Sequence, residues 1–183
     1  MSKNPDYDED KFAELMLYIA DQMEDEPWYG ATMLNKVLFF SDFLHYAEHG
    51  ESITGAEYHR LDHGPAPRRL LPVRNDLIAT ERAVIKERQV GARVQQRLLA
   101  RVEPDLSEFT ATEIKTVDSV ISALKDHTAT AVSDLTHTMS GWQIASDREE
   151  IPYQSVFLTS APVNDDDRAT AESLVGLAEA ALA

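Results

Sequence analysis

Two pairs of histidines have the spacing that helical metal sites use. His45 and His49 are four residues apart, and so are His59 and His63. Side chains four positions apart on a helix lie on the same face, where two imidazoles can ligate zinc. Only the first pair lies in a stretch with helical periodicity, and the zinc-protease signature needs glutamate directly after its first histidine, where this chain has Tyr46. We therefore expect no metal site and no other cofactor.

Signals for other catalytic chemistry are weak. The chain has no cysteine, and its seven glycines are scattered singly, so neither a thiolate nucleophile nor a glycine-rich phosphate loop is indicated. A G-x-S-x-G nucleophile elbow is missing. Adjacent carboxylates such as Glu149 and Glu150 are most simply solvated or helix-capping groups. The sequence predicts a protein without catalytic residues.

A helix-turn-helix is the pattern that could indicate DNA binding. Two expected helices, over residues 111–125 and 129–138, follow a possible hairpin that could act as a wing. The second of these helices contains no lysine or arginine, although recognition helices and their flanks normally approach the phosphate backbone with such residues. The formal net charge of −15 also repels phosphates. Nucleic acid is therefore an unlikely partner.

The charge is divided unevenly along the chain. Residues 60–101 contain ten Lys/Arg, nine of them arginine, and four Asp/Glu, whereas the remainder contains seven Lys/Arg and twenty-eight Asp/Glu. These arginines either pair with acidic helices of the same molecule or form a basic surface that faces a partner, since guanidinium groups suit bidentate carboxylate recognition. The sequence leaves both interpretations open.

Composition favours one compact domain. A chain of 183 residues with 43% hydrophobic content can bury a substantial core. The start of the chain, residues 1–10, is polar and acidic and lacks the apolar core of a signal peptide, and no run approaches the roughly 20 apolar residues that a membrane span needs. We expect a cytoplasmic protein without a membrane segment, in which residues 1–9 form a flexible acidic N-terminus.

Helical periodicity predicts two N-terminal helices. The first begins at Asp8 or Asp10 and reaches about residue 24. The second runs over residues 32–49, with Thr32 as its cap and Gly50 as its left-handed end. Phe40 is expected on the apolar face of the second helix, within the core.

The central part of the chain is expected to combine a short strand, a turn, a broken helix and a hairpin. Residues 56–62 look extended, and Gly64-Pro65 makes a turn. Pro67 fits the first turn of a helical segment, and Pro72 is expected to break that segment before it restarts and reaches about residue 80. Strands over residues 83–87 and 94–102 flank Gly91.

The C-terminal third should be helical with one irregular stretch. Thr110 and Glu113 match a capping box, which predicts a helix to about residue 125. A short helix beginning at Thr128 follows, then an irregular stretch over residues 141–153. A last acidic helix is expected over residues 164–182, within a C-terminal acidic segment of residues 161–183. The fold class is mainly α with a small β component, and the compact domain spans residues 10–160.

Three motifs in the centre of the chain, over residues 34–43, 50–58 and 64–67, resemble the Panacea domain, an antitoxin family also called SocA-like. The family carries an LNKLLYFADF helix, a G-x-x-[IV]-T-G-x-x-Y stretch and a GPVP turn. The three segments of this chain correspond to these in that order. The resemblance extends more weakly from about residue 12 to residue 153. Pro72 and Arg74 depart from the family, which usually has an uninterrupted helix at this point.

The resemblance implies a non-enzymatic antitoxin that binds a cognate protein toxin directly. An alternative is a proteolytic adaptor that delivers the toxin to a cytoplasmic protease, and an enzyme that reverses the toxin's modification is a third class, which no residue cluster supports. Two arginines at a helix start oppose the helix dipole unless carboxylates of the same chain or of a partner compensate them. Around that turn we expect the partner-binding residues Tyr58, His63, Arg68, Arg69 and Arg74.

Overall fold

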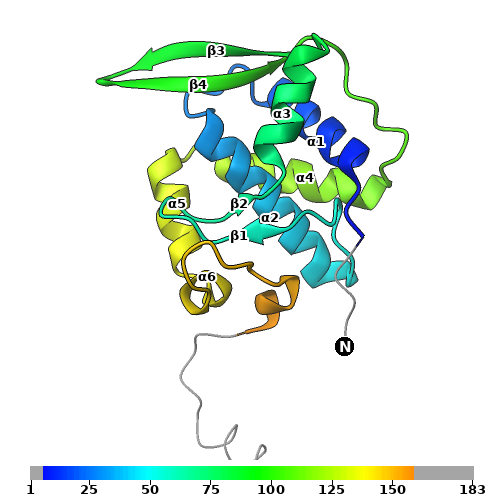
Figure 1. Cartoon of the computed structure of the whole chain (residues 1–183), viewed down its shortest axis with the longest axis vertical. Helices are drawn as coiled ribbons and strands as arrows, with labels where there is room; N and C mark the ends of the chain where they lie inside the picture. Colours follow the sequence, from blue (N-terminus) through cyan, green and yellow to red (C-terminus); the bar gives the residue numbers. More distant parts are fainter. Residues whose placement is uncertain (1–5, 159–183) are drawn as a thin grey trace, which may run out of the picture.

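The computed structural model describes residues 6–158, and one helix, α2 (Ala31–His49), runs through the middle of that part. Helices α1 (Glu9–Gln22), α4 (Ala111–Leu124) and α5 (Ala129–His137) pack around it (Figure 1). The short strand β2 (Ala66–Pro67) and the 3₁₀ helix η1 (Tyr153–Phe157) also contact α2. The predicted fold class, mainly α with a small β component in a compact domain, is confirmed.

The aromatic core forms around α2, whose expected apolar face is buried at Leu34, Val37 and Leu38, which are 3% exposed or less. Phe39 and Phe43 are 1% and 2% exposed, and their ring centroids are 4.2 Å apart. Phe40, expected in the core, is only half-buried, and Leu44 is 38% exposed. The expectation was right only in part: Phe40 packs against the core without being fully buried, and Phe39 and Phe43 are buried as well because elements pack on several sides of α2.

The helix ends follow the expected capping chemistry with one exception. Asp8 caps α1 by accepting from the backbone N–H of Lys11 at 2.9 Å, and Gly50 ends α2 with φ of 79°. Thr32 does not cap α2, because the helix begins one residue earlier, with Gly30 as a cap that has no side chain. The backbone N–H of Asp8, in the segment expected to be flexible, donates to the carbonyl of Thr54 at 2.9 Å.

The turn after β1 (Tyr58–His59) is held by strand pairing. β1 pairs antiparallel with β2 (Ala66–Pro67), so Pro67 lies in a strand and not in a helix. Helix α3 (Leu70–Ala79) is continuous, and the break expected at Pro72 is absent. Pro72 is the third helical residue, where a backbone N–H has no acceptor within the helix, so proline removes no hydrogen bond there.

Strands β3 (Ala83–Val90) and β4 (Arg93–Ala100) form an antiparallel hairpin at one end of the molecule (Figure 1). Its two-residue turn contains Gly91, with φ of 59°, as the sequence predicts. The base of the hairpin is part of the core, since Ala83 and Leu98 are 2% and 3% exposed. The distal half is largely exposed.

The C-terminal elements agree in part with the sequence. The capping box of Thr110 and Glu113 and the cap at Thr128 are both confirmed. The stretch expected to be irregular contains a short helix, α6 (Ser140–Ile144), as well as η1. The expected helix over residues 164–182 lies outside the described residues. No helix in the described part is both long and apolar enough to span a membrane.

Candidate functional site

A buried lysine joins α2 to the Gly-Pro turn. The Lys36 side chain is 1% exposed, and its Nζ donates to the carbonyl of Pro65 at 3.0 Å. A Cβ on Gly64 would lie 2.5 Å from that Nζ and would also collide with Thr136, and Gly64 has φ of 90°, so only glycine fits. Burial lowers the pKa of Lys36 to about 7. Lys36 therefore fixes the turn.

A buried carboxylate joins α2 to the segment before β1. Asp42 is 0% exposed and accepts three hydrogen bonds, from the Thr54 backbone N–H at 2.8 Å, the Thr54 hydroxyl at 2.7 Å and the Tyr58 hydroxyl at 2.7 Å. Burial raises the pKa of the Asp42 carboxyl, and the bonds from Thr54 and Tyr58 oppose that rise. Asp42 and Lys36 thus link the helix, the extended stretch and the turn.

Sequence reasoning missed both residues. The signal that could have found them is a charged residue within an otherwise buried run of α2, since an unpaired buried charge is costly and must have a fixed partner. The partners lie 12 to 29 residues away along the chain. Their contacts are therefore visible only in the folded molecule.

The five residues predicted to bind a partner do not form one surface. Tyr58 is 1% exposed and cannot contribute to a surface, which corrects that prediction. His63 is exposed, and its carbonyl accepts from the Ser133 hydroxyl at 3.0 Å. Arg74 is half-buried on α3, where its guanidinium donates to the side chain of Asn75 at 3.3 Å. Tyr58 is therefore a core residue, and His63 and Arg74 lie on separate elements.

The two arginines at the start of α3 have carboxylate partners in the same chain. Arg69 donates twice to Glu9, at 2.6 and 3.0 Å, and Arg68 lies 3.5 Å from Glu57. The Glu9 hydrogen bonds raise the pKa of Arg69. These contacts agree with the internal-pairing interpretation for this turn. A role of Arg68 and Arg69 in partner binding stays a prediction.

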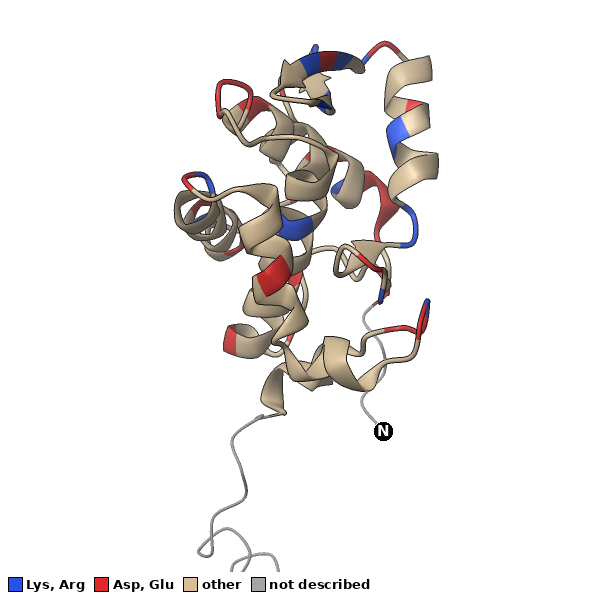
Figure 2. Cartoon of the chain, turned by 90° about the vertical axis from the view of Figure 1, so that its left-hand side faces the viewer, with Lys and Arg blue, Asp and Glu red and all other residues tan. Residues whose placement is uncertain are grey.

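The basic residues of the hairpin differ from those of the turn. At its base, Arg82 lies 2.6 Å from Glu14, and Arg97 donates to the carbonyls of Glu24 and Glu26 at 2.7 Å. The remaining hairpin and post-hairpin cations have no carboxylate of the described residues within 4 Å; these are Lys86, Arg88, Arg93 and Arg101. Figure 2 shows the hairpin at the top as the most strongly basic element of the view.

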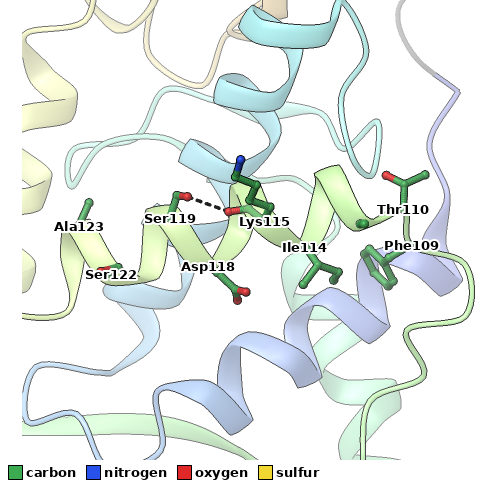
Figure 3. A pocket seen from close by; sticks show the side chains of 9 residues that line it. Phe109, Thr110, Ile114, Lys115, Asp118, Ser119, Ser122 and Ala123 are labelled. Carbon is green, nitrogen blue, oxygen red and sulfur yellow. Dashed lines mark hydrogen bonds between the residues drawn. The ribbon is translucent and has the colours of Figure 1, made fainter.

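A shallow, open hollow of about 930 Å³ lies along α4 and the residues before it. Figure 3 shows Lys115 and Asp118 pointing to opposite sides of this helix. Asp118 accepts from the Tyr18 hydroxyl at 2.6 Å, and the Ser119 hydroxyl donates to its own helix, to the carbonyl of Lys115 at 2.8 Å. The Asp118 carboxylate and the Ser119 hydroxyl thus have partners within the protein.

A second hollow, which we call the hairpin groove, lies between β4 and the starts of α2 and α5. Its volume is about 590 Å³. It is lined by Trp28, Gly30, Ala31, Thr32, Met33, Val90, Arg93, Val94, Gln95, Gln96, Thr128, Ala129 and Thr130. Trp28 is 37% exposed and Val94 is 56% exposed. This groove combines exposed apolar side chains with an unpaired arginine, which is typical of protein interfaces.

The histidine pairs do not form a metal site. The rings of His45 and His49 lie 4.5 Å apart, and Nδ1 of His45 is 2.8 Å from the carbonyl of Glu51. His59 belongs to β1, and burial lowers its pKa. Within residues 6–158, no group of three or more histidine and acidic side chains is placed to hold a metal ion.

Comparison with known proteins places these motifs in a family. The family model described as antitoxin SocA-like, Panacea domain, matches residues 34–143, from the first turn of α2 to α6. The chain belongs to this family. No curated protein and no solved structure matches it.

The Panacea match covers both of the regions described above. It includes Lys36, Asp42 and the Gly-Pro turn, and it also includes the hairpin, whose cations Lys86, Arg88 and Arg93 have no carboxylate of the described residues within 4 Å. Helix α1, which supplies the carboxylates of Glu9 and Glu14 to Arg69 and Arg82, lies before the matched residues. The family match therefore includes the arginines but not two of their acidic partners.

Proposed function

We propose that this Panacea-domain chain is an antitoxin that neutralises a cognate protein toxin by binding it directly. The observation that carries the proposal is the match to the SocA-like antitoxin family over residues 34–143. The buried charges support a binding role without catalysis, because Lys36 and Asp42 are used to hold the fold. Arg93 and the exposed apolar groups of the hairpin groove offer a surface for a protein partner.

Inducible co-expression with the adjacent reading frame tests this function. We expect the neighbouring product alone to arrest growth, and this chain to restore growth and to co-purify with that product. Titration of the purified toxin should reach full inhibition at a fixed stoichiometric ratio. The proposal is contradicted if the neighbouring product is not toxic, or if this chain does not protect against its toxicity.

The same experiment separates direct neutralisation from the two alternatives. A proteolytic adaptor protects only in a host with an active cytoplasmic protease, and toxin levels then fall when the chain is expressed. An enzyme that repairs or modifies the toxin protects at substoichiometric amounts and needs no stable complex. Protection in a protease-deficient host, with unchanged toxin levels and a stable complex, is the result expected for an antitoxin that acts by binding.

A further inference from the structure

The outer edge of β4 opens into the hairpin groove. The backbone N–H of Arg101 donates to the backbone carbonyl of Arg82 at 2.8 Å. In an antiparallel pair, residues that bond to the partner strand alternate with residues whose backbone groups point away from it, so this bond fixes which residues of β4 point outward. From that register, the backbone groups of Val94, Gln96 and Leu98 point away from β3. The carbonyl of Leu98 accepts from the Tyr29 hydroxyl at 2.8 Å, so this edge faces the loop before α2.

Part of this edge has no partner. β3 is the strand paired with β4, and the described residues place no further strand beside it. Val94 and Gln96 lie beyond the contact with Tyr29 and line the groove. Their outward N–H and C=O groups can pair with an added strand, which is how many extended peptides bind to sheet edges.

The side chains of the groove suit an apolar anchor. Trp28 and Val94 line the same groove and are 37% and 56% exposed, although both are large apolar residues. Partly exposed tryptophan is enriched among the residues that dominate binding energy at protein interfaces. An extended strand placed along β4 directs alternate side chains to one face, so one of them can reach this apolar pair.

The charge of the groove selects acidic partners. Arg93 lines it without a carboxylate of the described residues within 4 Å. Helix α2 starts there at Gly30, which provides no side-chain cap, and α5 starts there at Thr128. Helix starts carry partial positive charge, so the uncapped start of α2 favours a carboxylate, whereas α5 is already capped by the Thr128 hydroxyl, which accepts from the Ala131 N–H at 3.1 Å. The groove is therefore locally positive on a chain whose net charge is −15.

We propose that an acidic, extended segment of a partner protein binds in the hairpin groove as an added strand on the edge of β4. The segment places an apolar side chain against Trp28 and Val94 and a carboxylate near Arg93. The identity of this partner as the toxin rests on the proposed antitoxin function. The site itself rests on the strand register, the exposed apolar pair and the local charge.

A repeated dipeptide provides a matched test. Arg93-Val94 lies in the groove, and Arg101-Val102 is an exposed copy just beyond the end of β4. We expect Arg93→Glu with Val94→Asp to weaken the toxin complex at least about tenfold, because the variant loses both the charged contact of Arg93 and the apolar contact of Val94. The control, Arg101→Glu with Val102→Asp, makes the same change in net charge and should weaken it less than about threefold. Equal effects of the two variants overturn the proposal.

Proline tests the strand pairing separately from charge. Gln96→Pro removes an outward N–H on the groove edge, whereas Gln89→Pro removes one on the outer edge of β3. Neither change removes a hydrogen bond between β3 and β4. Thermal unfolding should be similar for both, and only Gln96→Pro should weaken the complex. A complex that tolerates Gln96→Pro contradicts the added strand.

A peptide probe keeps this proposal independent of the toxin. The probe is a blocked peptide of alternating Glu and Val residues, and its control replaces Glu with Lys. With ¹⁵N-labelled full-length chain, we expect the Glu peptide to shift the indole N–H signal of Trp28 and the Lys peptide to leave it unchanged. That response should be lost in the Arg93→Glu, Val94→Asp variant. If neither peptide shifts the signal, the groove does not select acidic strands.

The combined results distinguish this inference from the antitoxin function. A toxin that binds the wild type and both groove variants equally supports an antitoxin but overturns this site. A peptide that binds in the groove, when no toxin is found, retains the site and rejects the function. Wild-type self-association that the Arg93→Glu, Val94→Asp variant abolishes would place a second copy of the chain in the groove and overturn the assignment to a different partner.

Discussion

The Gly-Pro turn and the hairpin use similar basic residues in opposite ways. At the turn, Lys36 is buried and donates a hydrogen bond to the carbonyl of Pro65, and Arg69 pairs with Glu9 on α1. On the hairpin, Lys86 and Arg88 have no carboxylate of the described residues within 4 Å. Internal pairing and partner binding are therefore not competing interpretations of one basic region. The difference indicates that the turn maintains the fold while the hairpin is available for contacts.

The largest expected effect is at the buried charges of the turn region. Asp42→Ala should destabilise the chain by about 3 to 5 kcal/mol, because the buried donors on Thr54 and Tyr58 lose their acceptor. Chemical denaturation measures this change. Asp118→Ala is the control, since the Asp118 side chain is exposed although it also accepts from a tyrosine hydroxyl, that of Tyr18. A similar loss in both variants would show that burial of Asp42 is unimportant.

The pH dependence of stability should reveal the lowered pKa of Lys36. Its pKa is lowered by burial from 10.5 to about 7, so between these values the unfolded chain binds more protons than the folded chain. Stability should therefore rise as pH increases from about 7, by up to about 1.4 kcal/mol per pH unit from this group. Unfolding free energies measured from pH 7 to 9 test this. Lys36→Met should flatten the slope, and Lys115→Met, on the surface of α4, should not.

A smaller effect is expected for the arginine pair at the start of α3. Arg69→Glu places a carboxylate beside Glu9 at a helix start, and we expect the thermal midpoint to fall by a few degrees because a surface ion pair becomes a repulsion. The charge-swapped double variant, Glu9→Arg with Arg69→Glu, should recover most of the loss. No recovery in the double variant would mean that the pair does not hold α1 to α3.

The smallest effect on stability is expected on the hairpin. Lys86→Glu together with Arg88→Glu should change the free energy of unfolding by less than about 0.5 kcal/mol, because both side chains are exposed and unpaired within the described residues. The same chemical denaturation measures it. A loss as large as that of a core variant would show that these cations hold the fold, and the contrast between hairpin and turn would fail.

The sequence predicted the local features of the fold well. Gly50, Gly91 and the capping box at Thr110 act as their residue types require, because a left-handed backbone or a helix start depends on neighbours within a few residues. Pro72 was misread because its effect depends on its position within the helix. At the third residue of α3 it costs no hydrogen bond, and only the observed start of the helix reveals that.

The candidate site was predicted less well, since its contacts join distant segments. Tyr58 was assigned to a surface, but the hydroxyl bond to Asp42 and the surrounding rings place it in the core. Trp28 and Val94 are 66 positions apart, and no periodic pattern connects them. They line one groove because the hairpin lies beside the start of α2.

By itself, the sequence determined the fold class, the positions of most helices and the hairpin, and the family motifs in residues 34–67. These depend on hydrophobic periodicity, capping and turn residues, which act over short distances along the chain. The tertiary structure alone decided which charges are neutralised. Arg69 is paired because α1 brings Glu9 to it, and Arg93 is unpaired because none of the described residues brings it a carboxylate. Pairing between charges is a property of distance in space, which the linear sequence does not specify.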